Sequence, residues 1–135
     1  MRRWNSQDAE KLYEMAHKSE RKRAHQRLHA SNSEKVQRIL IALVKGSYVE
    51  PHFHQGSSQW EMFSLIEGRL LVRIYDVDGS EKEQYIIDHS SRDFFMVEFK
   101  PREIHSVECL SDRALILEVK EGPFDPENAK VLVSL

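Results

Sequence analysis

The chain has 135 residues, which suits one domain and leaves little room for a second. Its 20 Lys and Arg residues against 22 Asp and Glu residues give a formal net charge of −2, so no charge excess points to nucleic acid or an anionic membrane as a partner. Apolar residues make up 40% of the chain, which is enough for a packed core and excludes a disordered tail.

Cysteine content and the shortness of the apolar segments indicate where the protein resides. The single cysteine, Cys109, cannot form an intramolecular disulfide, which is typical of a reducing compartment. The residues after Met1 lack the apolar stretch of an export signal. The longest strongly apolar run, 39–44, is far short of the roughly 20 residues that span a bilayer. We therefore expect a soluble cytoplasmic protein without a membrane partner.

Residues 6–20 carry the one convincing helical pattern. Leu12 and Ala16 recur at the spacing of a helix face, and Asn5 or Ser6 can cap the start of the helix. The sequence therefore predicts one N-terminal helix.

From residue 35 onward the sequence consists of short β-rich runs separated by turn residues. The first run is apolar on both faces over its second half, which is typical of a strand buried on both sides. The dipeptide Asp78-Gly79 predicts a hairpin. In chain order, the predicted strands are 36–44, 48–54, 60–66, 69–77, 83–88, 93–99, 103–110 and 113–120.

Seven to eight short strands after one helix predict a mainly β fold, an antiparallel sandwich or barrel with a jelly roll among the favoured closures. An eight-stranded barrel encloses a volume suited to one small ligand, so we expect an interior site. The predicted organisation is a helix with a basic arm (1–33), a β-barrel (34–122) and a C-terminal tail packed on the barrel (123–135), all within one domain.

Three of the seven histidines can share a site. His52 and His54 are two residues apart in a predicted strand, so both imidazoles point to the same face. Hairpin pairing with the next strand would bring the Glu61 carboxylate beside them, and His105 lies in a later strand. Three imidazoles and one carboxylate suit Fe(II), Mn(II), Ni(II), Cu(II) or Zn(II). The alternative interpretation is a solvated strand face, because His-x-His pairs arise often by chance in a histidine-rich chain.

Two glycines, two histidines and a glutamate stand at a defined spacing: Gly46, five residues, His52-x-His54, six residues, Glu61, six residues, Gly68. This spacing resembles the first motif of the cupin superfamily, in which glycine turns bracket two ligand-bearing strands. The gap between the histidine pair and the glutamate is longer here than is usual in that motif.

Pro101 and His105 resemble the second cupin motif, whose histidine is the fourth metal ligand. Glu103 and Cys109 stand where that motif usually has glycine and asparagine. The resemblance implies a single cupin barrel that binds one divalent transition metal (Fe, Mn, Ni or Zn) through four side chains: His52, His54, Glu61 and His105.

A narrower resemblance covers most of the chain. Beyond the motifs above, it rests on Arg21-Lys22-Arg23 with His29, Val36-Gln37-Arg38, Gly46-Ser47-Tyr48-Val49, Glu118-x-Lys120 and Gly122-Pro123. These segments look like those of the WbuC-type cupin metalloproteins, small single-domain jelly rolls associated with bacterial surface-polysaccharide gene clusters.

The basic stretch 21–29 has two interpretations. An isolated charge run is usually a solvated connector. Alternatively, the stretch folds over the barrel mouth, where Arg21, Arg23 and His29 hold a carboxylate or phosphate, since arginine suits bidentate capture of such groups. Three further candidates for the pocket wall are equally explained by pairing or packing: Arg38, Tyr48 and Arg73.

The function that we expect is a divalent-metal enzyme acting on a small polar or anionic metabolite. The family resemblance implies a sugar or sugar-derived acid of surface-polysaccharide metabolism, with isomerase- or epimerase-like Lewis-acid chemistry. A mononuclear Fe(II) dioxygenase and a non-catalytic sensor module are the alternatives. No catalytic residue is assigned beyond the ligands, and Cys109 carries no assigned role. We expect a homodimer, because cupins often pair sheets or exchange N-terminal segments.

Overall fold

The computed structural model describes residues 1–56, 58–90, 94–128 and 130–133, and within these ranges one α-helix, one short 3-10 helix and ten strands are formed. In chain order, they are α1 (Ser6–Lys18), β1 (Arg23–Arg27), β2 (Val36–Val44), β3 (Tyr48–Phe53), β4 (Glu61–Glu67), β5 (Arg69–Tyr75), β6 (Glu81–Asp88), β7 (Met96–Phe99), β8 (Ile104–Cys109), β9 (Arg113–Glu121), η1 (Pro126–Asn128) and β10 (Val131–Leu132).

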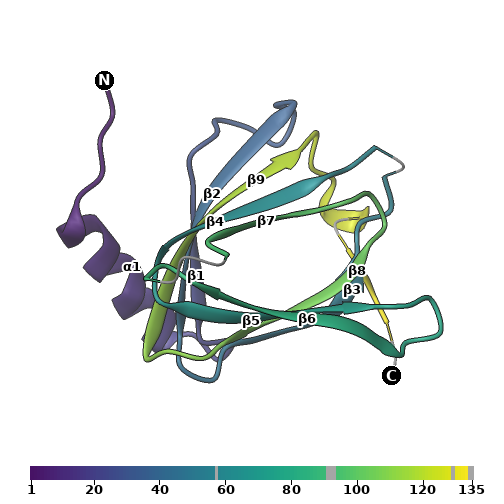
Figure 1. Cartoon of the computed structure of the whole chain (residues 1–135). Helices are drawn as coiled ribbons and strands as arrows, with labels where there is room; N and C mark the ends of the chain where they lie inside the picture. The colour runs from purple at the N-terminus through teal and green to yellow at the C-terminus, as the bar shows by residue number, and fades with distance from the viewer. Residues whose placement is uncertain (57, 91–93, 129, 134–135) are drawn as a thin grey trace.

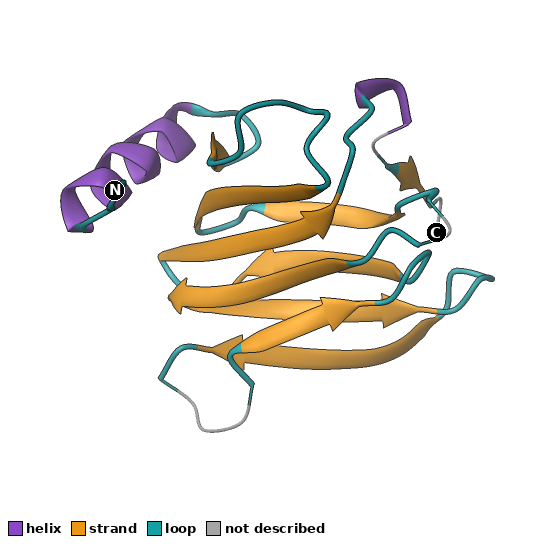
Figure 2. Ribbon diagram, turned by 90° about the horizontal axis from the view of Figure 1, so that it is seen from above, coloured by secondary structure: helices purple, strands orange, loops and turns teal. Residues whose placement is uncertain are grey.

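Two five-stranded antiparallel sheets form the body of the molecule and face each other (Figures 1 and 2). The strand order is β1-β2-β9-β4-β7 in the first sheet and β10-β3-β8-β5-β6 in the second. The mainly β prediction, a single jelly-roll type of fold with one N-terminal helix, is confirmed. The predicted hairpin at Asp78-Gly79 joins β5 to β6. No helix in the described ranges is long and apolar enough to cross a membrane.

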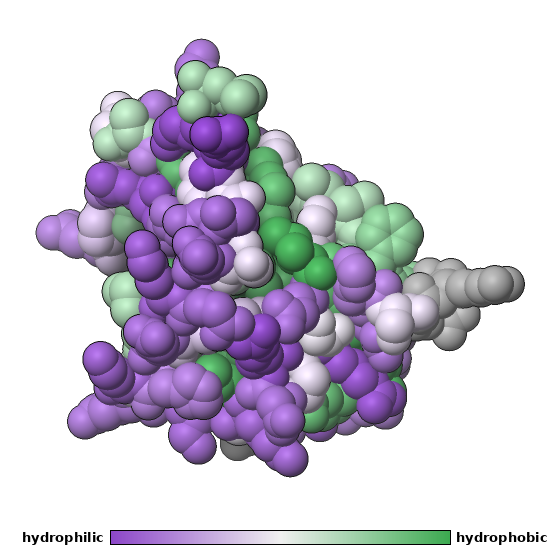
Figure 3. All heavy atoms as spheres, turned by 90° about the vertical axis from the view of Figure 1, so that its left-hand side faces the viewer, coloured by the Kyte–Doolittle hydropathy of each residue, from purple (hydrophilic) through white to green (hydrophobic). Residues whose placement is uncertain are grey.

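Helix α1 begins at a capping box. The Asn5 side chain accepts the backbone N–H groups of Gln7 and Asp8, and the Asp8 carboxylate accepts the Asn5 N–H at 2.8 Å. Such a cap stabilises by about 1 kcal/mol, whereas burying one leucine side chain stabilises by about 1.5–3 kcal/mol. Packing therefore contributes most to holding the helix, which buries Leu12, Tyr13 and Ala16 on the outer face of the first sheet. The surface on this side of the molecule is mainly hydrophilic, with a band of hydrophobic residues between the polar ones (Figure 3).

Strand β2 separates two apolar clusters, which explains its double-sided hydrophobicity. Ile41 and Leu43 point between the sheets into the main core, and Ala42 and Val44 point outward under α1. A strand with helix on one side and a second sheet on the other buries both faces, as the sequence predicts for this segment.

The basic stretch contains a strand, which neither interpretation of the sequence includes. Residues 23–27 form β1 and pair with β2 at the edge of the first sheet. Ala24 packs under α1, while Arg23 and His25 lie opposite Leu43 and Ile41, whose side chains point inward. Because residues directly opposite in an antiparallel pair share a face, Arg23 and His25 lie on the side of the first sheet that faces the second sheet.

The C-terminal segment joins the second sheet. Leu132 of β10 pairs with His52 of β3, and Val131 pairs with Phe53. This places the chain around Lys130 beside the histidine-bearing strand.

Candidate metal centre

The four predicted ligands come together between the sheets. His52 on β3 and His105 on β8 are direct register partners in the second sheet. His54 follows β3, and Glu61 is the first residue of β4 in the first sheet. Their ligand atoms all lie within 4.8 Å of one another. Ligand bonds of about 2.1 Å place the donors around one ion about 3 to 4.2 Å apart, so a small contraction would close this group on a metal.

The route by which Glu61 reaches the histidines differs from the predicted one. We expected hairpin pairing of two consecutive strands, but β3 and β4 belong to different sheets. The loop between them crosses from one sheet to the other, so Glu61 faces His52 and His54 across the interior.

Backbone carbonyls orient two of the imidazoles. His52 Nδ1 lies 2.7 Å from the Glu50 carbonyl oxygen, and His105 Nδ1 lies 2.9 Å from that of Glu103. Because a carbonyl only accepts hydrogen bonds, each Nδ1 carries the proton in the neutral ring, and each Nε2 keeps a free lone pair. This is the arrangement that metal-ligating histidines adopt.

The environment of His105 Nε2 tests whether a metal ion fits this group. The atom is buried and has no hydrogen-bond partner among the described residues, although it lies 3.5 Å from Glu61 Oε2. The same carboxylate oxygen lies 2.6 Å from His54 Nε2. A lone pair of His105 facing a carboxylate oxygen is repulsive, and either a cation between the two atoms or a second proton on the imidazole removes that repulsion. The donor set therefore fits a metal ion.

Burial and neighbouring charge set the protonation of the group. Burial raises the pKa of Glu61, but His105 and His54 hold that pKa well below its usual range. Burial, with the charge of His105, lowers the pKa of His52 to about 4. At neutral pH the glutamate is therefore a carboxylate and His52 is neutral, the forms that metal binding requires.

The lowered pKa of His52 predicts a pH-dependent stability of the metal-free chain. The unfolded chain binds the proton below its pKa of about 6.5, whereas the folded chain binds it only near 4. Stability from this group is complete above pH 6.5 and is lost as the pH falls, by about 2 kcal/mol between pH 7 and pH 5. Urea unfolding with chelator at both pH values measures the loss. A His52→Gln variant should lose about 2 kcal/mol less than the wild-type chain, and an equal loss in both contradicts the assignment.

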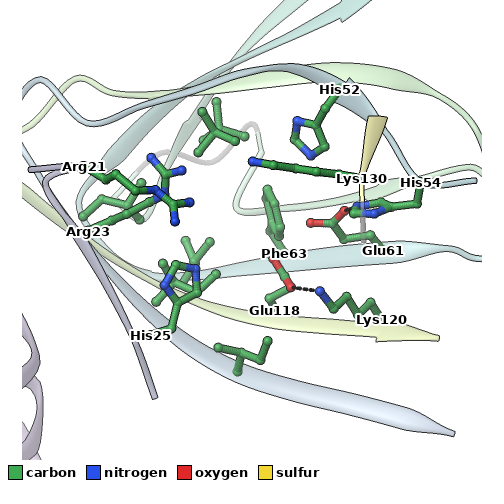
Figure 4. Close-up of a pocket in the computed structure, with 16 residues that line it drawn as sticks. Arg21, Arg23, His25, His52, His54, Glu61, Phe63, Glu118, Lys120 and Lys130 are labelled. Atoms are coloured by element: carbon green, nitrogen blue, oxygen red, sulfur yellow. Dashed lines mark hydrogen bonds and ion pairs between the residues drawn. The ribbon is translucent and has the colours of Figure 1, made fainter. Parts of the chain in front are cut away.

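A cavity of about 140 Å³ extends from the ligand group toward β1 (Figure 4). Ile41, Leu43, Phe63, Val107 and Ile116 form much of its apolar wall. Its polar lining contains Arg21 and Arg23, which the sequence predicts, and four residues to which the sequence analysis assigned no site role: His25, Glu118, Lys120 and Lys130.

Glu118 on β9 lines the cavity. It is 6% exposed, and its Oε1 lies 3.4 Å from Lys120 Nζ. Burial and the charge of Glu61 raise the pKa of Glu118 to about 8. The cavity therefore holds one ionised and one predominantly protonated carboxyl group at neutral pH.

Four other predicted residues do not line this cavity. His29 is buried, and its Nδ1 bonds the backbone of Arg38. The Arg38 side chain lies near Glu34, 3.9 Å away. Tyr48 and Arg73 line a separate surface pocket, where Arg73 pairs with Glu108 at 3.0 Å.

Residues missed by the sequence analysis had one usable signal. His25 follows the predicted residues Arg21 and Arg23 with period 2, which is typical of one face of a strand. Lys130 has no such signal, because its place depends on how the tail crosses the barrel.

Comparison with known proteins places the chain in a family. Residues 4–87 match the family model described as Domain of unknown function (DUF6016). The chain belongs to the DUF6016 family. No curated protein matches the sequence of this DUF6016 member.

Solved structures similar to this DUF6016 member are cupin-fold proteins, and the chain shares their fold. The capsular polysaccharide assembling protein CapF from Staphylococcus aureus is 17% identical with a TM-score of 0.71, over 87% of this chain and 33% of CapF. An oxalate oxidase in complex with glycolate is 14% identical with a TM-score of 0.65, over 85% and 57%. Oxalate decarboxylase from Lactobacillus farciminis is 23% identical with a TM-score of 0.58, over 76% and 28%. The chain thus spans about a third of CapF.

Proposed function

We propose that this protein is a divalent-metal enzyme acting on a small polar or anionic metabolite, with four ligands: His52, His54, Glu61 and His105. The observation that carries the proposal is the buried, unpartnered His105 Nε2, which faces the Glu61 carboxylate at one end of the cavity. Three neutral imidazoles and one carboxylate suit one Fe(II), Mn(II), Ni(II) or Zn(II) ion.

The metal ligands and the residues of the cavity wall have different roles in the proposed chemistry. A bound divalent metal supplies Lewis-acid polarisation of a carbonyl or hydroxyl oxygen. Three neutral histidines and one carboxylate leave a formal charge of +1 (2 − 1), which favours an anionic or chelating oxygen group of the substrate. Phe63, Leu43 and Ile116 give the cavity an apolar wall. Lys120 and Glu118 place a cation and a carboxyl group on the facing wall.

A sugar or sugar-derived acid of surface-polysaccharide metabolism is the substrate that we propose, converted by isomerase- or epimerase-like chemistry. Two observations support it. The sequence resembles the WbuC-type cupin metalloproteins, a narrower relationship that we propose on the segments given above. The fold is shared with CapF, a capsular polysaccharide assembling protein.

Element analysis of the purified full chain tests the metal assignment. We expect about one equivalent of a divalent transition metal per chain, removable by chelator and restored by adding the metal back. Less than about a tenth of an equivalent after reconstitution with each of Fe(II), Mn(II), Ni(II) and Zn(II) contradicts the proposal. Light scattering of the same preparation tests the predicted homodimer.

Turnover assays separate the enzymatic alternatives. Thermal-shift screening of sugar phosphates, nucleotide sugars and hydroxy acids selects the ligands for assay. Conversion under anaerobic conditions with Mn(II), Ni(II) or Zn(II) supports the isomerase-like reaction. Substrate-dependent oxygen consumption with Fe(II) alone favours the dioxygenase instead. Full metal occupancy with ligand binding but no turnover of any bound compound favours the sensor module.

A further inference from the structure

Two arginines lie at the end of the cavity away from the ligand group, and the Lys130 side chain reaches toward them from beside β3. Arg21 precedes β1, Arg23 is its first residue, and Lys130 precedes β10. Figure 4 shows the two guanidinium groups beside each other and the Lys130 ammonium group pointing toward them. Two segments more than 100 residues apart in sequence thus place like charges together.

Carboxylates do not neutralise these three cations. Among the described residues, no carboxylate oxygen lies within 4.0 Å of the side-chain nitrogens of Arg21, Arg23 or Lys130, whereas Arg73 and Arg113 pair with glutamates at 2.6–3.0 Å. Glu50 is near enough to favour the charged forms of Arg23 and Lys130, and Glu61 favours that of Lys130, but neither carboxylate forms an ion pair with them. Burial and mutual repulsion lower the pKa of both Arg23 and Lys130. Repulsion between like charges that have no counter-charge destabilises the folded chain, and a bound anion would offset this repulsion.

Backbone contacts hold the arginines in place. The Ser47 hydroxyl, which is buried, donates to the Arg21 carbonyl at 3.1 Å, and the Ser19 hydroxyl accepts the Arg21 N–H at 3.2 Å. Arg23 Nη1 donates to the Tyr48 carbonyl at 3.3 Å. A guanidinium group has five N–H donors, so Arg23 keeps most of its donors for a ligand.

We propose that Arg21, Arg23 and Lys130 bind the carboxylate or phosphate group of a small substrate, so that the substrate of this cavity is an anion held between the two arginines and the Lys130 ammonium group. The inference rests on the proposed function in that one molecule occupies the cavity between the two groups. Planar guanidinium groups pair with carboxylate and phosphate oxygens in a bidentate fashion, and Lys130 adds a point charge. Nucleic acid is not the expected ligand, because the chain is net acidic.

Calorimetric titration of the chelator-treated full chain with inorganic phosphate and with malonate, at constant ionic strength in chloride, tests the inference without the metal. We expect saturable binding in the millimolar range or tighter. Arg21→Gln, Arg23→Gln and Lys130→Gln should each weaken it at least about tenfold. Arg27→Gln is the matched control, because Arg27 lies on the same strand but contacts Asn32 outside the cavity and should leave binding unchanged. Unfolding midpoints verify that each variant is folded.

Tighter binding of phosphate than of malonate identifies a phosphorylated substrate, and the reverse order identifies a carboxylate. Absence of saturable binding of either anion up to about 20 mM overturns the inference, as does an equal loss in Arg27→Gln and Arg23→Gln. A chain that takes up metal but binds neither anion overturns the inference and leaves the proposed function standing. A chain that binds the anions through these residues but takes up no metal supports the anion site and contradicts the proposed function.

Discussion

Replacing His105 with alanine is expected to empty the metal centre. His105 Nε2 is buried without a hydrogen-bond partner among the described residues and lies 3.5 Å from Glu61 Oε2, so its lone pair contributes directly to the group. Changes to groups that merely surround metal ligands typically cost 10- to 100-fold in affinity, and loss of a ligand should cost more. Element analysis after dialysis against the reconstituting metal should show full occupancy in the wild-type chain and less than about a tenth in His105→Ala.

Two further variants make this result interpretable. His54→Ala should behave like His105→Ala, because His54 Nε2 lies 2.6 Å from the same carboxylate oxygen. His17→Ala is the matched control, because His17 is an exposed residue at the end of α1. Full occupancy in His54→Ala, or an equal loss in His17→Ala, would refute the ligand assignment.

Gly68→Ala is expected to destabilise the fold by about 2–5 kcal/mol. Gly68 connects β4 to β5 with φ of +91°, a conformation that costs an alanine about 1–2 kcal/mol. A Cβ there would also press on the Arg113 carbonyl and lie 2.7 Å from the Ala114 Cα. Backbone atoms of β9 must then shift, and overpacking of this kind adds about 1–3 kcal/mol. Urea denaturation measures the difference.

Gly46→Ala separates the two causes. Gly46 has nearly the same φ, +88°, but the nearest atom to its added Cβ is the flexible end of Lys22, 3.1 Å away. The cost there should therefore be about 1–2 kcal/mol, from the backbone alone. Equal losses in the two variants would show that the close approach of β9 has no energetic consequence.

Local patterns predicted most elements of the fold. The Asn5 cap and the spacing of Leu12 and Ala16 gave the helix, which ends two residues earlier than predicted. The strand expected at 36–44 has the same bounds in β2. The strand expected at 93–99 begins partly outside the described residues, and its described part is β7, Met96–Phe99. Strand β1 was missed because a strand that presents basic residues to a cavity lacks the apolar alternation by which strands are recognised.

The ligand candidates were accessible to sequence reasoning, but their arrangement was not. His52 and His54 are two residues apart and share a face from backbone geometry alone. Glu61 was expected beside them through a hairpin, and instead faces them from the other sheet. The spacing in the sequence cannot distinguish a hairpin from an approach from the opposite sheet, because both arrangements bring the Glu61 carboxylate to the same point.

By itself, the sequence determined the division into one helix and a series of short strands, and the donor types that can meet a metal. These follow from side-chain periodicity and spacing, which act over a few residues. Only the tertiary structure decided that Glu61 faces the histidines from the other sheet. It also decided that Glu118 is buried beside Glu61 and that Lys130 lines the same cavity as Arg21 and Arg23. Such contacts depend on which distant segments pair and pack. Packing decides which groups are buried, and charges interact through space between residues that no local sequence pattern connects.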